Sequence, residues 1–155
     1  MKLVVPAVLV GLLLLSAGGA WAQAPRHHCA RVGTDDALRP LPPSFVGQVV
    51  RLFGLERMPI AQVERSTVIR CMEGRLLACN YGANLPCGKA NTSASLPAAA
   101  DWCRQKPDAD FIPAYISGHD SAYRWRCTDG APVAGGPVAR TDARGFLARY
   151  WKPLD

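Results

Sequence analysis

The pattern of hydrophobic and polar positions sets the amino-terminal end apart from the rest of the chain. Lys2 is followed by an apolar run from Leu3 to Leu15. Small residues come next, and two overlapping Ala-x-Ala sequences end at Ala22 and Ala24. A positive residue, an apolar run and a small-residue cleavage site are typical of a secretory signal peptide. We therefore expect a signal peptide over residues 1–22, with cleavage possible up to Ala24.

An uncleaved membrane anchor is the alternative, because residues 3–22 carry no charged side chain and about 20 apolar residues can span a bilayer. The small residues at the end of this stretch favour cleavage instead. No later apolar stretch approaches that length. We therefore expect no stable membrane insertion once the signal peptide is removed.

Residues 23–43 show no apolar period and are rich in proline, arginine, histidine and aspartate. A segment without regularly spaced apolar residues has little to bury against a core. We therefore expect a mobile leader over residues 23–43. A single disulfide-rich domain over residues 44–155 should follow, since its length suits one domain.

A helical period opens this domain. Phe45 and Val49 recur at helical spacing, Ser44 is a candidate N-cap after two prolines, and Gly54 is placed to end the helix. This pattern predicts a helix over Ser44–Phe53 with one apolar face packed on a sheet. Binding of a partner by that face is the alternative.

Two further segments alternate around a two-residue turn. Thr67–Met72 and Arg75–Cys79 flank Glu73-Gly74, and Ala122–Thr128 precedes Asp129-Gly130. Glycine accepts the positive φ that such turns need. We therefore expect two β-hairpins.

The two hairpins share the sequence Arg-Cys-x-acid-Gly, which we interpret as one design used twice. A two-residue turn in the first hairpin places Cys71 opposite Leu76 and Cys79 opposite Val68. The two sulfurs then lie on opposite faces, because side chains alternate along a strand. A Cys71–Cys79 disulfide is therefore disfavoured, and each cysteine should join another element.

The remaining segments complete the fold. Asn80–Ser95 predicts a polar loop pinned by Cys87, and Pro97–Gln105 predicts a second short helix. Phe111–Ile116 predicts a strand, with its proline indicating an edge or bulge. Gly145–Trp151 predicts another strand, with one helical turn as the alternative. The expected fold class is α+β: a small antiparallel sheet of hairpins with two short helices, stapled by disulfides.

The cysteines indicate the compartment. An even number of cysteines in an exported chain predicts a disulfide framework, with the candidates Cys29, Cys71, Cys79, Cys87, Cys103 and Cys127. For Cys29, a thiol that pairs between chains is the alternative. Zinc is the alternative, but the chain has no Cys-x2-Cys pair and His119 is the only histidine beyond the leader. Several connectivities are open to three bridges. Cys87–Cys103 is the pair we favour, because it would join the polar loop to the second helix.

The chain is basic, with 18 Lys and Arg against 12 Asp and Glu and a formal charge of +6. Loss of Lys2 with the signal peptide leaves this charge positive. A positive exported protein suits an acidic envelope polymer or protein as partner, and a solvated surface that keeps the chain soluble is the alternative. No run of consecutive Lys or Arg marks a nucleic-acid patch, so we expect no nucleic-acid partner.

The second hairpin carries the candidate binding residues. Tyr123 and Trp125 alternate with two arginines, so the aromatic side should face the core and the arginine side the solvent. Guanidinium groups two residues apart on a strand can bind carboxylates, sulfates or phosphates bidentately. The sequence therefore predicts an anion-binding surface on loops 80–89 and 117–126, with the candidate residues Arg124, Arg126, His119 and Lys89.

Catalytic groups are sparse. A nucleophile needs a base within reach and a group that orients the base, and the compact candidates Ser117, His119, Asp120 and Ser121 fall in one tight turn, where side chains fan outward. Asp108 and Asp110 offer a second candidate, a pair of carboxylates for acid and base catalysis, but the sequence around them is typical of a loop. We expect no catalytic residue and no cofactor, with a hydrolase using His119 as the less favoured alternative.

One metal site is conceivable in the leader. Cleavage after Ala24 would make His27 the third residue, where its side chain, the terminal amine and backbone nitrogens suit square-planar Cu(II) or Ni(II). Cleavage after Ala22 removes this site. Asn91-Thr92-Ser93 matches the glycosylation sequon, which matters only in a eukaryotic host.

Two segments carry a resemblance to a known family. Val68–Ala90, which reads IRCMEGRLLACNYGANLPCGKA after its first Val, and Ala109–Gly130 together cover about half of the expected mature chain. They resemble a family of small exported bacterial proteins of unknown function, which implies a periplasmic setting and adds no site residues.

A second resemblance is coarser. The chain is similar in size, cysteine use and strand content to lysozyme-inhibitor modules of the bacterial envelope. Ser117–Tyr123 loosely resembles their Ser-Gly and Tyr loop, whereas Gly82–Cys87 has no counterpart. We therefore expect an exported, non-catalytic binding or inhibitory module, periplasmic or secreted, with a structural envelope protein without a specific ligand as the alternative.

Overall fold

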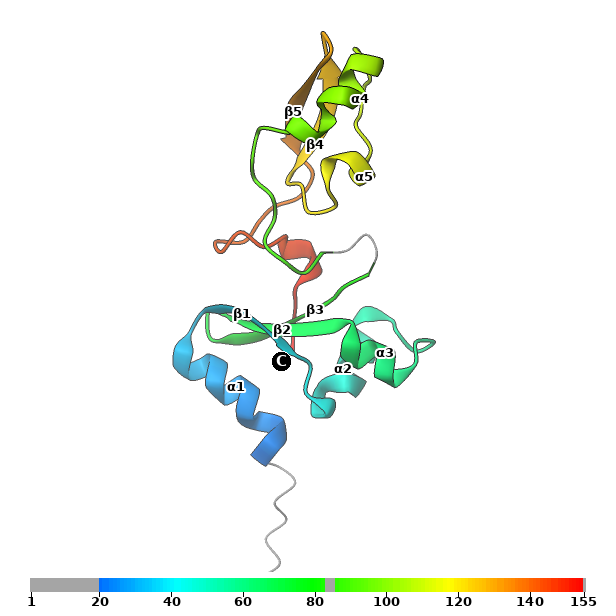
Figure 1. The fold of residues 1–155 in the computed structure, drawn as a ribbon. Coiled ribbons are helices and arrows are strands. Elements are labelled where there is room, and N and C mark those ends of the chain that lie inside the picture. Colours follow the sequence, from blue (N-terminus) through cyan, green and yellow to red (C-terminus); the bar gives the residue numbers. More distant parts are fainter. Residues whose placement is uncertain (1–19, 83–85, 155) are drawn as a thin grey trace, which may run out of the picture.

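The computed structural model of the protein describes residues 20–82 and 86–154. Within them, short helices and two antiparallel sheets confirm the predicted α+β fold. Figure 1 shows the smaller sheet at one end of the molecule and the larger sheet nearer the middle, with the red carboxy-terminal segment between them. Most of the predicted signal peptide, residues 1–19, and residues 83–85 of the predicted binding loop lie outside the described residues. None of the described helices is both long and apolar enough to cross a membrane.

The larger sheet contains the first predicted hairpin. Its strand order is β1 (Asp35–Pro40), β2 (Thr67–Met72), β3 (Arg75–Asn80) and β6 (Lys152–Pro153). Glu73 and Gly74 both have positive φ, 51° and 78°, as a two-residue type I′ turn requires. Cys71 lies opposite Leu76, as predicted, and Cys79 lies opposite Val68.

Three helices pack on one face of this sheet: α1 (Ala20–Val32), α2 (Val46–Phe53) and α3 (Ile60–Arg65). The predicted helix over Ser44–Phe53 is confirmed, because the 3-10 helix η2 (Pro43–Phe45) leads into α2 and Gly54 ends it with a φ of 68°. Ser44 is not its N-cap, since it lies inside η2 and no side chain caps either helix. Val46 and Val49 are buried against the sheet.

The prediction of a mobile leader over residues 23–43 is wrong. α1 and β1 occupy most of it, and Cys29 is fully buried and bonded to Cys71 in β2. Arg26 donates hydrogen bonds to the Leu154 carbonyl oxygen at 2.8 Å and to Gln48 Oε1 at 3.0 Å. The segment lacks an apolar period because a disulfide and polar contacts attach it to the sheet.

The opposite face of the sheet is covered by the carboxy-terminal segment. Arg70 of β2 is 1% exposed and forms an ion pair with Asp142. Its guanidinium carbon lies 4.1 Å from the Phe146 ring centroid and 4.5 Å from that of Trp151. The predicted strand over Gly145–Trp151 is wrong. Phe146 and the residue after it are both buried, so the alternation fails, and the chain forms the alternative helical turn, η4 (Ala148–Tyr150).

The smaller sheet is the second predicted hairpin, formed by β4 (Tyr123–Thr128) and β5 (Ala131–Pro137). Asp129 and Gly130 again have positive φ, 50° and 76°. Trp125 and Cys127 are buried with the helices η3 (Pro97–Ala99) and α4 (Ala100–Gln105), which confirm the predicted second helix. Both β4 arginines are exposed, as predicted. The two hairpins therefore share a turn but not a burial pattern, because Arg70 is buried at the position that matches exposed Arg126.

The prediction of a strand over Phe111–Ile116 is also wrong. The Ile112 N–H donates to the Trp125 carbonyl oxygen at 2.7 Å, so the chain runs beside β4 as far as this residue. Pro113 has no N–H to continue such pairing. Instead its carbonyl oxygen accepts the first hydrogen bonds of helix α5 (Ala114–Ser117).

Three disulfides join Cys29 to Cys71, Cys79 to Cys87 and Cys103 to Cys127. Cys71 and Cys79 are not joined to each other, as predicted. The favoured Cys87–Cys103 pair is wrong, because Cys103 on α4 packs over the inward-facing Cys127 of β4. Cys87 instead packs beside Cys79 at the end of β3.

A surface ion-pair cluster predicts a pH dependence of stability. Hydrogen bonds from Arg144, and then from Lys89, hold the pKa of Asp36 well below its usual value of 3.8. A carboxyl group whose pKa is lower in the folded chain stabilises the fold above its unfolded pKa and loses this effect as pH falls through its folded pKa. We therefore expect Asp36→Asn to unfold at a lower temperature than the native chain at pH 7, with the difference shrinking below about pH 4.

Thermal unfolding monitored by circular dichroism from pH 7 to pH 2 measures this difference. About 1 M salt at pH 7 serves as the control and should also reduce it, because exposed charges are screened. A difference that stays constant down to pH 2 would contradict the assignment to the Asp36 carboxylate.

Candidate functional site

A polar pocket lies where the smaller sheet meets the carboxy-terminal segment. It has a volume of about 460 Å³. Its walls come from the loop before α5, from α5 and the turn after it, from β4, and from η4. This size lies within the range of about 300–1,000 Å³ that is usual for ligand pockets.

Three basic side chains line this pocket from three separate segments. Arg124 comes from β4, His119 from the turn after α5, and Arg149 from η4. In the described part of the chain no carboxylate forms an ion pair with either arginine. Asp110 is the single acidic residue among those that line the pocket. The pocket is therefore positively charged.

A β-bulge positions Arg124. Tyr123 pairs with Pro137 and Trp125 with Ala134, so two glycines of β5 lie opposite the single residue Arg124. A bulge of this kind bends the strand and changes the direction of the side chain beside it. A Cβ on Gly135 would lie 3.2 Å from the Arg124 carbonyl oxygen. Glycine therefore allows the close approach of the two strands behind this arginine.

The turn that carries His119 is also fixed by the backbone. The Asn91 N–H donates to the Asp120 carbonyl oxygen, and the Ala122 N–H donates to the Asn91 carbonyl oxygen, both at 2.8 Å. The polar loop thus clamps the carboxy-terminal side of the turn. The His119 side chain itself is exposed.

Arg149 is oriented by its neighbour. Its guanidinium group donates to the Tyr150 hydroxyl, and its central carbon lies 4.6 Å from the Tyr150 ring centroid. Phe146 and Leu147, both buried, anchor the start of this segment. Arg149 is therefore held at the pocket by a packed aromatic ring.

The serine and histidine side chains do not form a catalytic arrangement. Ser121 Oγ accepts hydrogen bonds from Trp125 Nε1 at 2.8 Å and from the Tyr123 N–H, and it donates to the Tyr123 carbonyl oxygen. The Asp120 carboxylate lies against Gly118. Among the described residues, no hydrogen bond links His119 to a serine or a carboxylate. The turn thus offers no nucleophile held by a base.

The structure brings together only part of the predicted site. His119 and Arg124 line the pocket, whereas Arg126 is exposed on the same strand outside it. Lys89 lies elsewhere and pairs with Asp36 at 2.8 Å. The sequence does not reveal Arg149 as a site residue, because alternation over Gly145–Trp151 predicts a strand where the structure has the helical turn η4.

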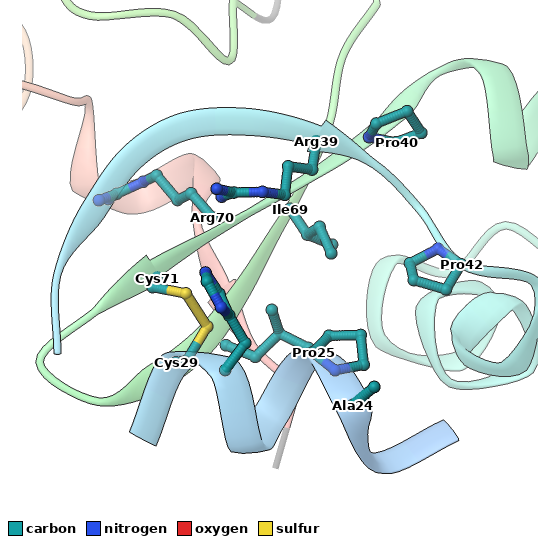
Figure 2. Close-up of a pocket in the computed structure, with 11 residues that line it drawn as sticks. Ala24, Pro25, Cys29, Arg39, Pro40, Pro42, Ile69, Arg70 and Cys71 are labelled. Carbon is teal, nitrogen blue, oxygen red and sulfur yellow. A yellow bond between two sulfur atoms is a disulfide. The ribbon is translucent and has the colours of Figure 1, made fainter. Parts of the chain in front are cut away.

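A second pocket, of about 260 Å³, lies between α1 and the larger sheet (Figure 2). Pro25 of α1, Ile69 of β2 and the Cys29–Cys71 disulfide form its walls. Arg39 of β1 extends across it, but Asp35 accepts a hydrogen bond from Arg39 at 2.6 Å. This pocket therefore offers an apolar surface and no unpaired charge.

The described residues contain no group of three or more His, Cys, Asp or Glu side chains placed to hold a metal ion. His27, the residue of the conceivable copper or nickel site, lies inside α1. In this structure α1 begins at Ala20, so the terminal amine that a square-planar site needs does not lie next to His27.

The site is thus a positively charged pocket whose basic groups are fixed by a bulge, a clamped turn and a packed tyrosine. Such an arrangement can bind an anion through charge-assisted hydrogen bonds. Comparison of the chain with protein-family models, with curated proteins and with solved structures finds no match.

Proposed function

We propose that this protein is an exported, non-catalytic binding or inhibitory module of the bacterial periplasm, and that it holds an anionic group of its ligand in the pocket between β4, α5 and η4. One observation carries the proposal: Arg124, Arg149 and His119, from three separate segments, line one pocket in which a single carboxylate is present. Guanidinium forks bind carboxylates, sulfates and phosphates bidentately.

The non-catalytic part of the proposal rests on what the polar groups already do. Ser121 Oγ accepts hydrogen bonds from the Tyr123 backbone and from the Trp125 indole, so it reinforces the wall of the pocket. Rigid donors without a nucleophile favour binding over turnover.

The exported part rests on the cysteines and the amino terminus. All six cysteines form disulfides, and disulfides persist in oxidising compartments such as the periplasm. The apolar run and Ala-x-Ala sequences of the precursor supply the export signal. The family resemblance at Val68–Ala90 fits the same setting.

Binding of two carboxylate oligomers of equal charge, oligoglutamate and oligogalacturonate, tests the proposal. We expect at least one of them to bind, and we expect Arg124→Ala and Arg149→Ala each to weaken this binding about tenfold or more, as the loss of a charge-assisted hydrogen bond implies. Titration calorimetry measures the affinities.

Arg126→Ala is the matched control, because it removes the same charge from the same strand outside the pocket. It should weaken binding less than about twofold, since an exposed charge contributes little. An equal loss with Arg126→Ala would assign binding to diffuse charge and contradict the pocket. No binding of either oligomer would contradict the proposal and favour a structural envelope protein.

A further inference from the structure

An exposed aromatic surface lies beside the basic pocket. Phe111 is 68% exposed and Tyr115 is 72% exposed, more than the other large hydrophobic residues in the described part of the chain. They lie on either side of Pro113, where the chain enters α5. Contiguous exposed apolar patches often mark interaction sites, whereas single exposed residues are ordinary.

One of the exposed rings, Tyr115, is braced by α4. Tyr115 meets Trp102 edge to face, with ring centroids 6.2 Å apart and an interplanar angle of 86°. Lys106 Nζ lies 4.2 Å from the Trp102 ring centroid on the same helix. These contacts hold Tyr115 in place and add a positive charge next to it.

The aromatic surface lies next to the basic pocket. Beside the basic pocket lies another hollow, of about 400 Å³. It is lined by Trp102, Lys106 and Tyr115 together with Asp110 and Phe111. Asp110 and Phe111 also line the basic pocket. The two hollows therefore share a wall, and one extended ligand can contact both the exposed rings and the two arginines.

The combination selects a chemical class. A sugar ring presents a flat face of C–H groups that packs on an aromatic ring, and its hydroxyl groups need polar partners around it. A uronic acid or another acidic sugar adds a carboxylate for a guanidinium group. An acidic peptide such as oligoglutamate supplies the carboxylates but no flat ring for the exposed aromatic side chains.

We propose that the ligand is an acidic saccharide chain, with sugar rings packed on Phe111 and Tyr115 and carboxylates bound by Arg124 and Arg149. This inference rests on the proposed function and names the ligand class of the same site. It adds the two aromatic residues to the binding surface.

The experiment compares oligogalacturonate with oligoglutamate of equal charge. We expect tighter binding of the saccharide, and we expect Phe111→Ala and Tyr115→Ala each to weaken saccharide binding about fivefold or more while leaving oligoglutamate binding unchanged. Saturation-transfer NMR should show contact between the protein and the ring protons of the sugar. Ile60→Ala is the matched control, because Ile60 is exposed on α3 at the other end of the molecule.

The outcomes distinguish failure of the saccharide inference from failure of the proposed anion binding. Equal binding of both oligomers, sensitive to Arg124→Ala but not to Phe111→Ala, would overturn the saccharide inference and leave anion binding intact. Tighter binding of oligoglutamate would favour a peptide ligand and also overturn it. No binding of either oligomer would overturn both proposals. Near-ultraviolet circular dichroism of every variant confirms that it is folded.

Discussion

Replacing Asp142 by alanine is expected to lower the free energy of unfolding by about 3–5 kcal/mol, because it leaves a buried charge without its partner. Arg70 is 1% exposed, and Asp142 is the carboxylate that pairs with it. Arg70 Nε and Nη1 have no hydrogen-bond partner among the described residues, and the guanidinium group packs against both the Phe146 and Trp151 rings. Water therefore cannot easily replace the lost carboxylate. Urea denaturation measures the change.

A second variant separates the charge from the packing. Arg70→Met removes the buried charge but leaves Asp142 Oδ1 accepting the N–H groups of Arg144 and Phe146 at 2.8 and 3.1 Å. We expect Arg70→Met to cost less than Asp142→Ala. Adding Arg70→Met to Asp142→Ala should restore part of the lost stability, because the unpaired charge is then gone.

Asp101→Ala is the control, since Asp101 pairs with Arg104 on the exposed face of α4. It should change the free energy of unfolding very little. If Asp142→Ala and Asp101→Ala had equal effects, the buried pair would not be what fixes the carboxy-terminal segment to the sheet.

Local chemistry explains which elements the sequence predicts well. Glu73-Gly74 and Asp129-Gly130 each force a tight turn, and the strands on either side follow from the turn. The inward and outward sides of β4 follow from alternation alone. These features depend on neighbours in sequence, so the sequence reveals them.

Features that depend on distant contacts are harder to predict. Arg70 and Arg126 occupy matching positions in two similar hairpins, yet only Arg70 is covered, because Phe146 and Trp151 return to it from far along the chain. α1 similarly shows no helical apolar stripe, since a disulfide attaches it to β2. The residues next to Arg70 and next to Cys29 in the sequence do not reveal these distant partners.

The candidate site divides in the same way. His119 and Arg124 lie on one hairpin and the turn before it, so a surface containing both is predictable. Arg149 enters the pocket from a segment predicted as a strand, and Phe111 was assigned to another. These two errors in secondary structure therefore concealed Phe111, Tyr115 and Arg149, three of the four residues that we propose bind the ligand.

Removing the Cys29–Cys71 disulfide is expected to destabilise the fold more than removing Cys79–Cys87. The first closes a loop of 42 residues and the second a loop of 8. Loop-closure entropy in the unfolded chain then gives losses of about 4 and about 2.5 kcal/mol for the two double-alanine variants. Urea denaturation of both variants under non-reducing conditions measures the two losses.

The longer bridge also has a structural consequence that the shorter one lacks. Cys29 is the fully buried residue of α1, and the other contacts that hold this helix include the Arg26 hydrogen bonds to Leu154 and Gln48. Without the bridge, we expect the backbone amides of α1 to exchange hydrogen faster, because the covalent link between this helix and the sheet is gone. In the variant without Cys79–Cys87, α1 should exchange at the native rate. Equal exchange in both variants, or a larger loss of stability from the shorter loop, would show that α1 is held by its polar contacts instead of by the disulfide.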